Sequence, residues 1–290
     1  MHRMTVYLLL LVLAVTPAFG GWEYTATTQA EGGRGSEGMR SSIKGLADGA
    51  KSRVEFLDSG NPMMPAGSYM VSSDGGSTIY LVNPKQKSYA VWDVESMMGM
   101  AGGAMQMMGM KFSTPKVEKL LEEKGPAIHG FPTTHYRYRS SYTMEVNFMG
   151  IRRSTETINE EDVWATTDIK DEGMGVWLKQ KTMKTGNEEL DKLLEAEMSK
   201  IKGFPLKRVV VTTSKQSDGS SETMRMTSEI TSIKKSAVPA SVFDVPKDYT
   251  EESMFPDGGL PTGGSGGPGA GQGDSGAGDN PFLKMLQQRK

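Results

Sequence analysis

Three Asp-Gly pairs, each set between segments rich in strand-forming residues, constrain the fold of this chain more than any other feature. They are Asp48-Gly49, Asp74-Gly75 and Asp218-Gly219. Asp-Gly tolerates the positive φ angles that tight hairpin turns require. Asn83-Pro84 marks a further reversal, between the segments IYLV and SYAVWDV. The chain is therefore expected to form a mainly antiparallel β-sheet that begins with a meander over residues 22–93.

Strands are also expected in the second half of the chain. The segment YRYRSSYTMEVNF from Tyr136 alternates in polarity, which predicts a half-buried strand with a bulge at Ser140-Ser141, or two strands. Another strand is expected over residues 162–169, and a last hairpin flanks Asp218-Gly219. The whole chain should thus contain about nine to eleven strands.

Two segments have helical rather than alternating patterns. Residues 114–125 begin with Thr114-Pro115, a capping residue followed by proline, and end at Gly125. Residues 187–203 begin with Asn187 as the expected N-cap, carry acidic residues in the first turn and lysines near the end, and place leucines on one face. The expected fold class is α+β, with these helices closing over one face of the sheet.

Both ends of the chain are expected to lie outside this domain. Residues 1–20 combine cations, an apolar run and small residues before the cleavage site, as a secretory signal peptide does. No Asn-x-Ser/Thr sequon is present, which favours the periplasm of a Gram-negative bacterium. Residues 21–255 would form the domain, 256–280 a Gly/Ser-rich linker, and 281–290 a short tail. No membrane span is expected after cleavage.

Composition argues against several classes of function. With 33 Lys and Arg against 35 Asp and Glu, the chain lacks the positive charge that nucleic-acid binding uses. It has no cysteine, which excludes thiolate metal sites and cysteine nucleophiles. Beyond the leader its only histidines are His129 and His135, and no Gly-x-Ser-x-Gly motif is present. His135 falls on the same strand face as Arg137 and Arg139, which we interpret as a solvated face. We therefore predict no enzymatic activity and no cofactor.

The unusual chemical feature is a run of seven methionines in ESMMGMAGGAMQMMGM. They are Met97, Met98, Met100, Met105, Met107, Met108 and Met110. Methionine packs adaptably and lines surfaces that accept varied apolar ligands, so the run is interpreted either as core or lid packing or as a hydrophobic ligand site. Because thioethers also bind Cu(I) or Ag(I), a metal site is the alternative, with four ligands: Met97, Met100, Met105 and Met108. Glycines in the run, which each lower helix stability by up to ~1 kcal/mol, favour a loose lid.

The order of several segments resembles a bacterial periplasmic family known as domain of unknown function 4412. These segments are IYLVNPKQKSYAVWDVESMMGMAGG, HGFPTTHYRY, DVWATTDI, KGFPLKRVVV and SAVPASVFDVPKDY. The last, Val238 to Pro246 followed by Tyr249, is the most specific. The family looks related to the lipoprotein-localisation carriers (LolA/LolB-like), which implies a curved half-barrel sheet with helices packed in its concave face. Family members often carry a cysteine where this chain has Thr133 and Thr134, so no redox role carries over.

These observations together favour a non-catalytic secreted protein that binds a lipid or another apolar molecule in a half-barrel cavity. A Cu(I)- or Ag(I)-binding protein and an envelope scaffold that uses its C-terminal tail for docking are the alternatives. Ligand, protein partners and oligomeric state are not determined by the sequence.

Overall fold

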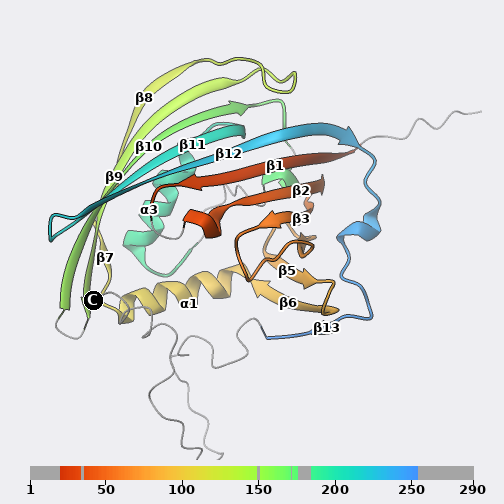
Figure 1. Ribbon diagram of the computed structural model, residues 1–290, viewed down its shortest axis with the longest axis horizontal. Helices are drawn as coiled ribbons and strands as arrows, with labels where there is room; N and C mark the ends of the chain where they lie inside the picture. Colours follow the sequence, from red (N-terminus) through yellow and green to blue (C-terminus); the bar gives the residue numbers. More distant parts are fainter. Residues whose placement is uncertain (1–19, 34–35, 149–150, 171, 176–183, 254–290) are drawn as a thin grey trace, which may run out of the picture. The chain divides into compact units, whose positions relative to one another are not determined.

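Thirteen strands among the described residues form one open sheet (Figure 1). The computed structural model of the chain describes residues 20–33, 36–148, 151–170, 172–175 and 184–253. The signal peptide, linker and tail expected at the two ends therefore fall outside the described residues, except for Gly20. In chain order the strands are β1 (Gly21–Glu31), β2 (Ser41–Asp48), β3 (Lys51–Ser59), β4 (Tyr69–Ser72), β5 (Thr78–Asn83), β6 (Ser88–Asp93), β7 (Lys111–Phe112), β8 (Lys116–Lys124), β9 (Thr134–Phe148), β10 (Ile151–Thr166), β11 (Phe204–Gln216), β12 (Ser221–Ser236) and β13 (Thr250–Glu251).

The order of the strands across the sheet follows the hairpins. It is β13-β6-β5-β4-β3-β2-β1-β12-β11-β10-β9-β7, and β8 also pairs with β9. All pairings between these strands are antiparallel except that of β13 with β6. The mainly antiparallel, open sheet is therefore confirmed, but the expected nine to eleven strands were too few. Two of the additional strands, β7 and β13, are only two residues long and have no sequence pattern of their own.

The predicted hairpins are confirmed at each Asp-Gly pair. Gly49, Gly75 and Gly219 follow β2, β4 and β11, and all three have positive φ, between 58° and 88°. A side chain would be strained in this left-handed region, which explains glycine at these turns. The reversal at Asn83-Pro84 is confirmed too, since residues 84–87 connect β5 to β6.

Two expectations about strands and helices were wrong. Residues 116–124 form strand β8 and not a helix, because the edge of β9 offers backbone partners to this segment on both sides of a register shift at Leu120. Its Leu120 is consequently 46% exposed. Strand β9 also pairs with β10 in one unbroken register, without a bulge at Ser140-Ser141. Tyr136, Tyr138, Tyr142 and Met144 all lie at even positions, so one register suffices.

The helices are α1 (Val94–Met107), α2 (Glu172–Gly175) and α3 (Glu188–Ser199). The helix predicted at 187–203 is confirmed as α3, and the Asn187 side chain caps it by accepting a hydrogen bond from the Leu190 amide. Most of the methionine run, from Met97 to Met107, lies in α1, which has Asp93 as its N-cap; Met108 is the C-cap, and Met110 follows it. Helix α1 connects β6 to β7, which lie near opposite ends of the strand order (Figure 1). The expectation of two helices within the concave face needs correction, because residues 116–124 form β8, whereas Leu190 and Leu193 of α3 pack in a cluster with Tyr142 and Met144 of β9.

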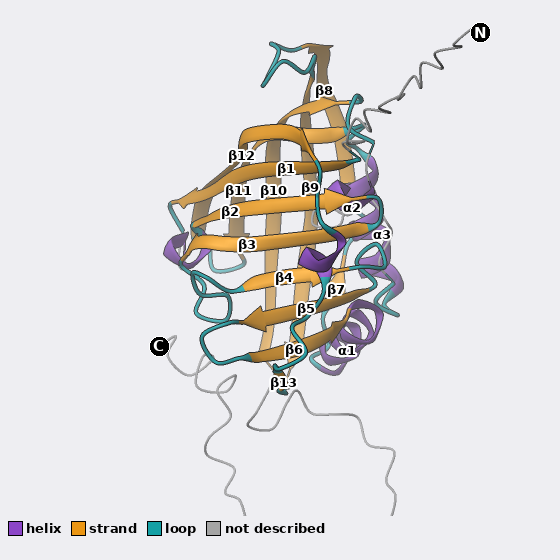
Figure 2. Ribbon diagram, turned by 90° about the vertical axis from the view of Figure 1, so that its right-hand side faces the viewer, coloured by secondary structure: helices purple, strands orange, loops and turns teal. Residues whose placement is uncertain are grey.

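The sheet bends, so that β7, β9 and β10 run behind β1 to β6 in Figure 2. Residues 238–249, here called the C-terminal strap, cross β3 to β6 on the side of the sheet that is turned away from β9 and β10. The strap carries a 3₁₀ turn, Ala240–Phe243, and packs on Tyr69, Val71 and Val82. We call the side covered by the strap the outer face, and the side turned toward β9 and β10 the inner face.

One end of the inner face is filled by a core cluster. Its buried members come from six elements or loops: Trp22, Tyr24, Ala47, Ile169, Met174, Phe204, Leu206 and Ile230. The Tyr24 ring lies directly on Gly45, where an added Cβ would be 2.0 Å from the ring carbon Cζ. Burial raises the pKa of the Tyr24 phenol. This packing closes the inner face at the end where β1 begins.

Candidate functional site

The inner face carries two neighbouring rows of side chains that differ in chemistry. The strand register places Ile230, Ala26, Ile43 and Phe56 side by side across β12, β1, β2 and β3. The next row in the same direction consists of Arg208, Ser228, Thr28, Ser41 and Ser59. Because residues two apart on a strand share a face, both rows lie on the side of the sheet that holds Tyr24. We call them the apolar row and the polar row.

The apolar row continues into a cluster on β2 to β6, here called the inner apolar cluster. Its buried members are Phe56, Met70 and Ile79, and its partly buried members are Ile43, Met64, Leu81, Trp92 and Val94. Strands β4 and β5 alternate between this cluster and the one beneath the strap, so they are covered by apolar side chains on both faces. Their near-continuous apolar sequence could have revealed the second face, since strands buried on both sides lose the alternating pattern.

Several side chains of the inner apolar cluster are only half-buried. Ile43, Leu81 and Trp92 remain partly exposed to solvent, although they lie on the inner face, around which the sheet bends. Side chains in a filled core lose nearly all contact with solvent. This part of the inner face thus keeps apolar surface accessible.

A network of buried charges lies beside the polar row. The carboxylate of Glu161 on β10 is 1% exposed and is ion-paired with Arg208 of β11 and with Lys200, whose Nζ lies 2.6 Å from Glu161 Oε2. Lys200 Nζ also lies 2.6 Å from Glu197 Oε2, and its backbone carbonyl accepts a hydrogen bond from the Tyr138 hydroxyl. Lys200 follows α3, where the sequence predicts a lysine that suits the helix dipole. The structure shows that it ties the end of α3 to the sheet.

The seven methionines of the predicted site do not gather in one place. Met105 and Met110 pack on a cluster formed by Phe112, Leu190 and Leu193. Met100 is 44% exposed and Met107 is 62% exposed, whereas Met97, Met98 and Met108 are half-buried. The run therefore divides between packing against α3 and contact with solvent.

The four proposed metal ligands form two pairs along α1 and its C-cap, Met108. Met97 and Met100 are three residues apart, and so are Met105 and Met108. At 1.5 Å per residue, Met97 and Met108 are separated by about 16 Å along the helix axis. One ion bound by all four thioethers would require α1 to unwind, whereas either pair alone could approach an ion.

Helix α1 is held close to the segment that precedes α3. Gly102 is its buried residue, and a Cβ at this position would lie 2.1 Å from the carbonyl oxygen of Thr185. Thr185 is fixed in turn, because its amide and its hydroxyl both donate to Asp191 Oδ1 at 2.7 Å. The glycine that the sequence suggested as a source of looseness is thus a packing residue.

Gly102→Ala is expected to destabilise the protein by about 1 to 3 kcal/mol, because the methyl group overpacks the contact with Thr185. At Gly103, by contrast, an added methyl group would meet open space. Gly103→Ala should therefore stabilise the same helix, by up to ~1 kcal/mol. Urea unfolding of the two variants and the wild type measures both effects. Equal shifts in the same direction would contradict the close contact at Gly102.

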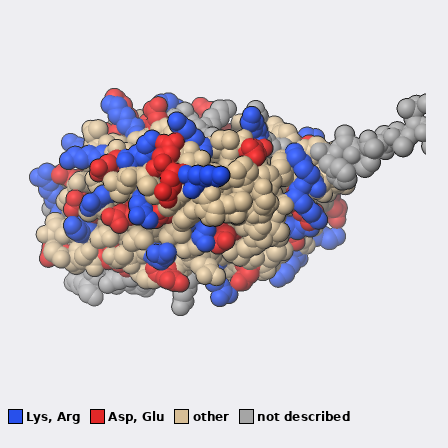
Figure 3. Space-filling model, turned by 90° about the horizontal axis from the view of Figure 1, so that it is seen from above, with Lys and Arg blue, Asp and Glu red and all other residues tan. Residues whose placement is uncertain are grey.

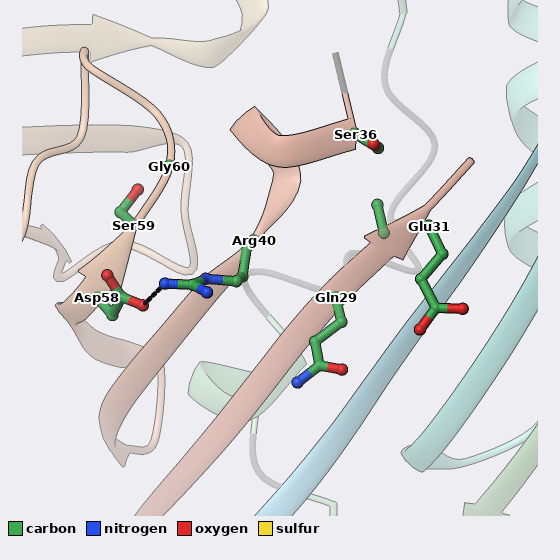
Figure 4. A pocket seen from close by; sticks show the side chains of 8 residues that line it. Gln29, Glu31, Ser36, Arg40, Asp58, Ser59 and Gly60 are labelled. Atoms are coloured by element: carbon green, nitrogen blue, oxygen red, sulfur yellow. Dashed lines mark hydrogen bonds and ion pairs between the residues drawn. The ribbon is translucent and has the colours of Figure 1, made fainter. Parts of the chain in front are cut away.

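A groove of about 540 Å³ opens at the ends of β1, β2 and β3, beside the 3₁₀ turn Ser36–Met39 (Figure 4). Its lining includes Gln29, Glu31, Ser36, Arg40, Asp58 and Ser59. Arg40 Nη2 and Asp58 Oδ2 lie 2.9 Å apart, and both side chains are more than half exposed. Gln29 and Asp58 alternate along their strands with Thr28 and Ser59 of the polar row, so they lie on the other face, although Ser59 also lines the groove. This groove is polar and separate from the inner apolar cluster.

His135 lies on the outer face, as the alternation predicted, but it is not solvated. Its ring stacks on Trp164 with centroids 4.4 Å apart, and its Nε2 lies 2.7 Å from Asp162 Oδ1. Partial burial opposes ionisation of Asp162, but hydrogen bonds from Arg137 and His135 outweigh it and lower the pKa of this carboxyl group.

On the face of the molecule shown in Figure 3, acidic and basic side chains are intermingled.

No helix in the described ranges is both long and apolar enough to pass through a membrane. A search of curated proteins finds no match to the chain. Residues 36–249 match the model of a family described as a domain of unknown function (DUF4412). The match includes the sheet from β2 to β12, the helices and the whole C-terminal strap, and we conclude that the chain belongs to this family.

Proposed function

We propose that this protein is a non-catalytic binding protein that holds the hydrocarbon part of a lipid-like molecule on the inner apolar cluster. The half-burial of Ile43, Leu81 and Trp92 supports the proposal, because these side chains lie on the inner face of a bent sheet and still contact solvent. The cluster contains aliphatic, aromatic and methionine side chains, the types that line binding sites for apolar ligands.

Two features of the surroundings suit such a ligand. The apolar row carries no charged residue, and its partly exposed members, Ala26 on β1 and Ile43 on β2, offer apolar contact to an extended chain, while Ile230 and Phe56 at its two ends are buried. The core cluster around Tyr24 closes one end of the face and would stop the chain there. The half-barrel carrier architecture expected from the sequence, and secretion to the periplasm, are part of this proposal.

Trp92→Gln tests the proposal, with Val91→Gln as the matched control. The two residues are neighbours on β6 and therefore point to opposite faces; Val91 is 39% exposed. Full burial of a large apolar side chain contributes about 1.5 to 3 kcal/mol, so Trp92→Gln should weaken binding of the neutral dye Nile red by about tenfold or more. Val91→Gln should leave the affinity unchanged.

Mass spectrometry of the purified wild-type protein provides an independent readout, since a bound lipid should co-purify. Thermal unfolding of both variants shows that each remains folded before the dye is titrated. A wild type that binds neither Nile red nor any co-purified lipid would contradict the proposal, and so would equal effects of the two substitutions.

A further inference from the structure

We propose that Arg208 is the binding site for an anionic headgroup, so that the ligand is an anionic amphiphile: an acyl chain that ends in a carboxylate or a phosphate. This inference rests on the proposed function, because it assigns the head of a molecule whose chain lies on the inner apolar cluster. Arg208 occupies the end of the polar row on β11 and thus lies on the inner face.

The guanidinium group of Arg208 has unused donors. Its Nε donates to Glu161 Oε1, and within the described ranges no acceptor contacts its terminal nitrogens. The side chain is 35% exposed, although it lies on the inner face. An arginine has five N–H donors in a planar fork that matches carboxylate and phosphate geometry. Arg208 can therefore keep its ion pair with Glu161 and still bind an anion.

The other charges of the network are already matched. Lys200 is 3% exposed and lies between Glu161 and Glu197, so its charge is balanced on two sides. Two cations and two carboxylates make the network neutral without a ligand. Arg208 is the member that combines a positive charge with solvent exposure and open donors. An entering anion would thus meet Arg208 rather than Lys200.

The position of Arg208 fits the length of an acyl chain. The polar row places it next to the apolar row, and three strand spacings of about 4.8 Å each separate it from the strand of Ile43. A chain that starts at Arg208 can therefore pass beside the buried Ile230 and over the partly exposed Ala26 and Ile43. The hydroxyl groups of Ser228 and Thr28, 3.1 Å apart, lie beside the headgroup position and can hydrogen-bond to it.

Isothermal titration with three ligands of equal chain length tests the inference: dodecanoate, dodecyl phosphate and neutral dodecanol. The wild type should bind an anionic ligand at least about tenfold more tightly than the alcohol, and comparison of dodecanoate with dodecyl phosphate identifies the preferred head. Arg208→Met should remove this preference and leave dodecanol binding unchanged. Arg225→Met, an exposed arginine of β12 on the outer face, is the matched control and should behave as the wild type.

Different failures have different meanings. Binding of none of the three ligands would contradict the proposed function itself. Equal affinity for dodecanol and both anions, or equal effects of the two arginine substitutions, would overturn only the role of Arg208. If Arg208→Met fails to fold because Glu161 loses a partner, the double variant Glu161→Gln/Arg208→Met restores the charge balance.

A measurement on the wild type alone is also decisive. The carboxyl group of ¹³C-carboxyl dodecanoate should titrate at lower pH when it is bound than when it is free, and an unchanged or higher pKa of this carboxyl group would refute the site.

Discussion

Replacement of Lys200 by methionine is expected to lower the free energy of unfolding by about 3 to 5 kcal/mol, because one partner of a buried ion pair is removed. Glu161 is 1% exposed and would keep only Arg208, while the Glu197 carboxylate would lose its cation. Denaturant unfolding followed by circular dichroism measures the change. Helix α3 should also detach more easily, since Lys200 is its link to β10.

The control for this prediction lies on α3 itself, which Lys200 follows. Lys192 pairs with Glu188 at 2.6 Å, but both side chains are more than half exposed. Lys192→Met should therefore change stability by less than about 0.5 kcal/mol. The double variant Glu161→Leu/Lys200→Met removes both buried charges and should recover part of the loss. If Lys200→Met and Lys192→Met had equal effects, the buried network would contribute no more than a surface pair.

Phe243→Ala should destabilise the protein by about 3 to 5 kcal/mol, because it leaves a cavity in the apolar cluster between the strap and the outer face of the sheet. Phe243 is 4% exposed and packs with Tyr69, Val71 and Val82. Arg53 reinforces the contact: its Nη1 donates to the Val242 carbonyl at 3.2 Å and its guanidinium lies 3.5 Å from the Tyr69 ring centroid. Thermal unfolding and limited proteolysis measure the effect.

Proteolysis separates loss of the strap from general destabilisation. Under native conditions the variant should be cut first within residues 238–249, and the sheet should persist. Leu57→Ala, at a 49% exposed position on β3, is the control and should change stability by less than about 0.5 kcal/mol. An uncut strap in Phe243→Ala, or equal shifts in both variants, would show that the strap does not depend on this anchor.

Local signals explain which elements could be predicted from the sequence. Each Asp-Gly turn depends on the backbone conformations that two adjacent residues allow. Helix α3 begins at Asn187, whose side chain accepts a hydrogen bond from the Leu190 amide three residues later. Residues 114–125 had similar local signals for a helix, yet the free edge of β9 made them a strand. Helix α1 forms despite its glycines, because Asp93 caps it and Gly102 packs on Thr185.

The candidate site was less accessible to sequence reasoning. The methionines of the run are close together in the sequence, but the structure separates them: Met105 and Met110 pack in a cluster with residues of α3, while Met100 and Met107 are exposed. The polar row combines residues from Thr28 to Ser228, two hundred positions apart, and none of them belongs to a motif. The sequence around Arg208 predicts only an amphipathic strand. The face that carries Arg208 becomes the inner face because the sheet bends, and no pattern along the strand indicates that bend.

The sequence by itself determined the strand-rich class of the fold, its hairpins and the helix that starts after Asn187, because these depend on interactions between residues close along the chain. Tertiary structure alone decided the pairing of β8, the route of the strap over the outer face, and the meeting of Arg208 with Glu161. The physical reason is that sheet edges, buried charges and apolar faces acquire their partners only when distant segments pack together, and no local pattern records which partner that will be.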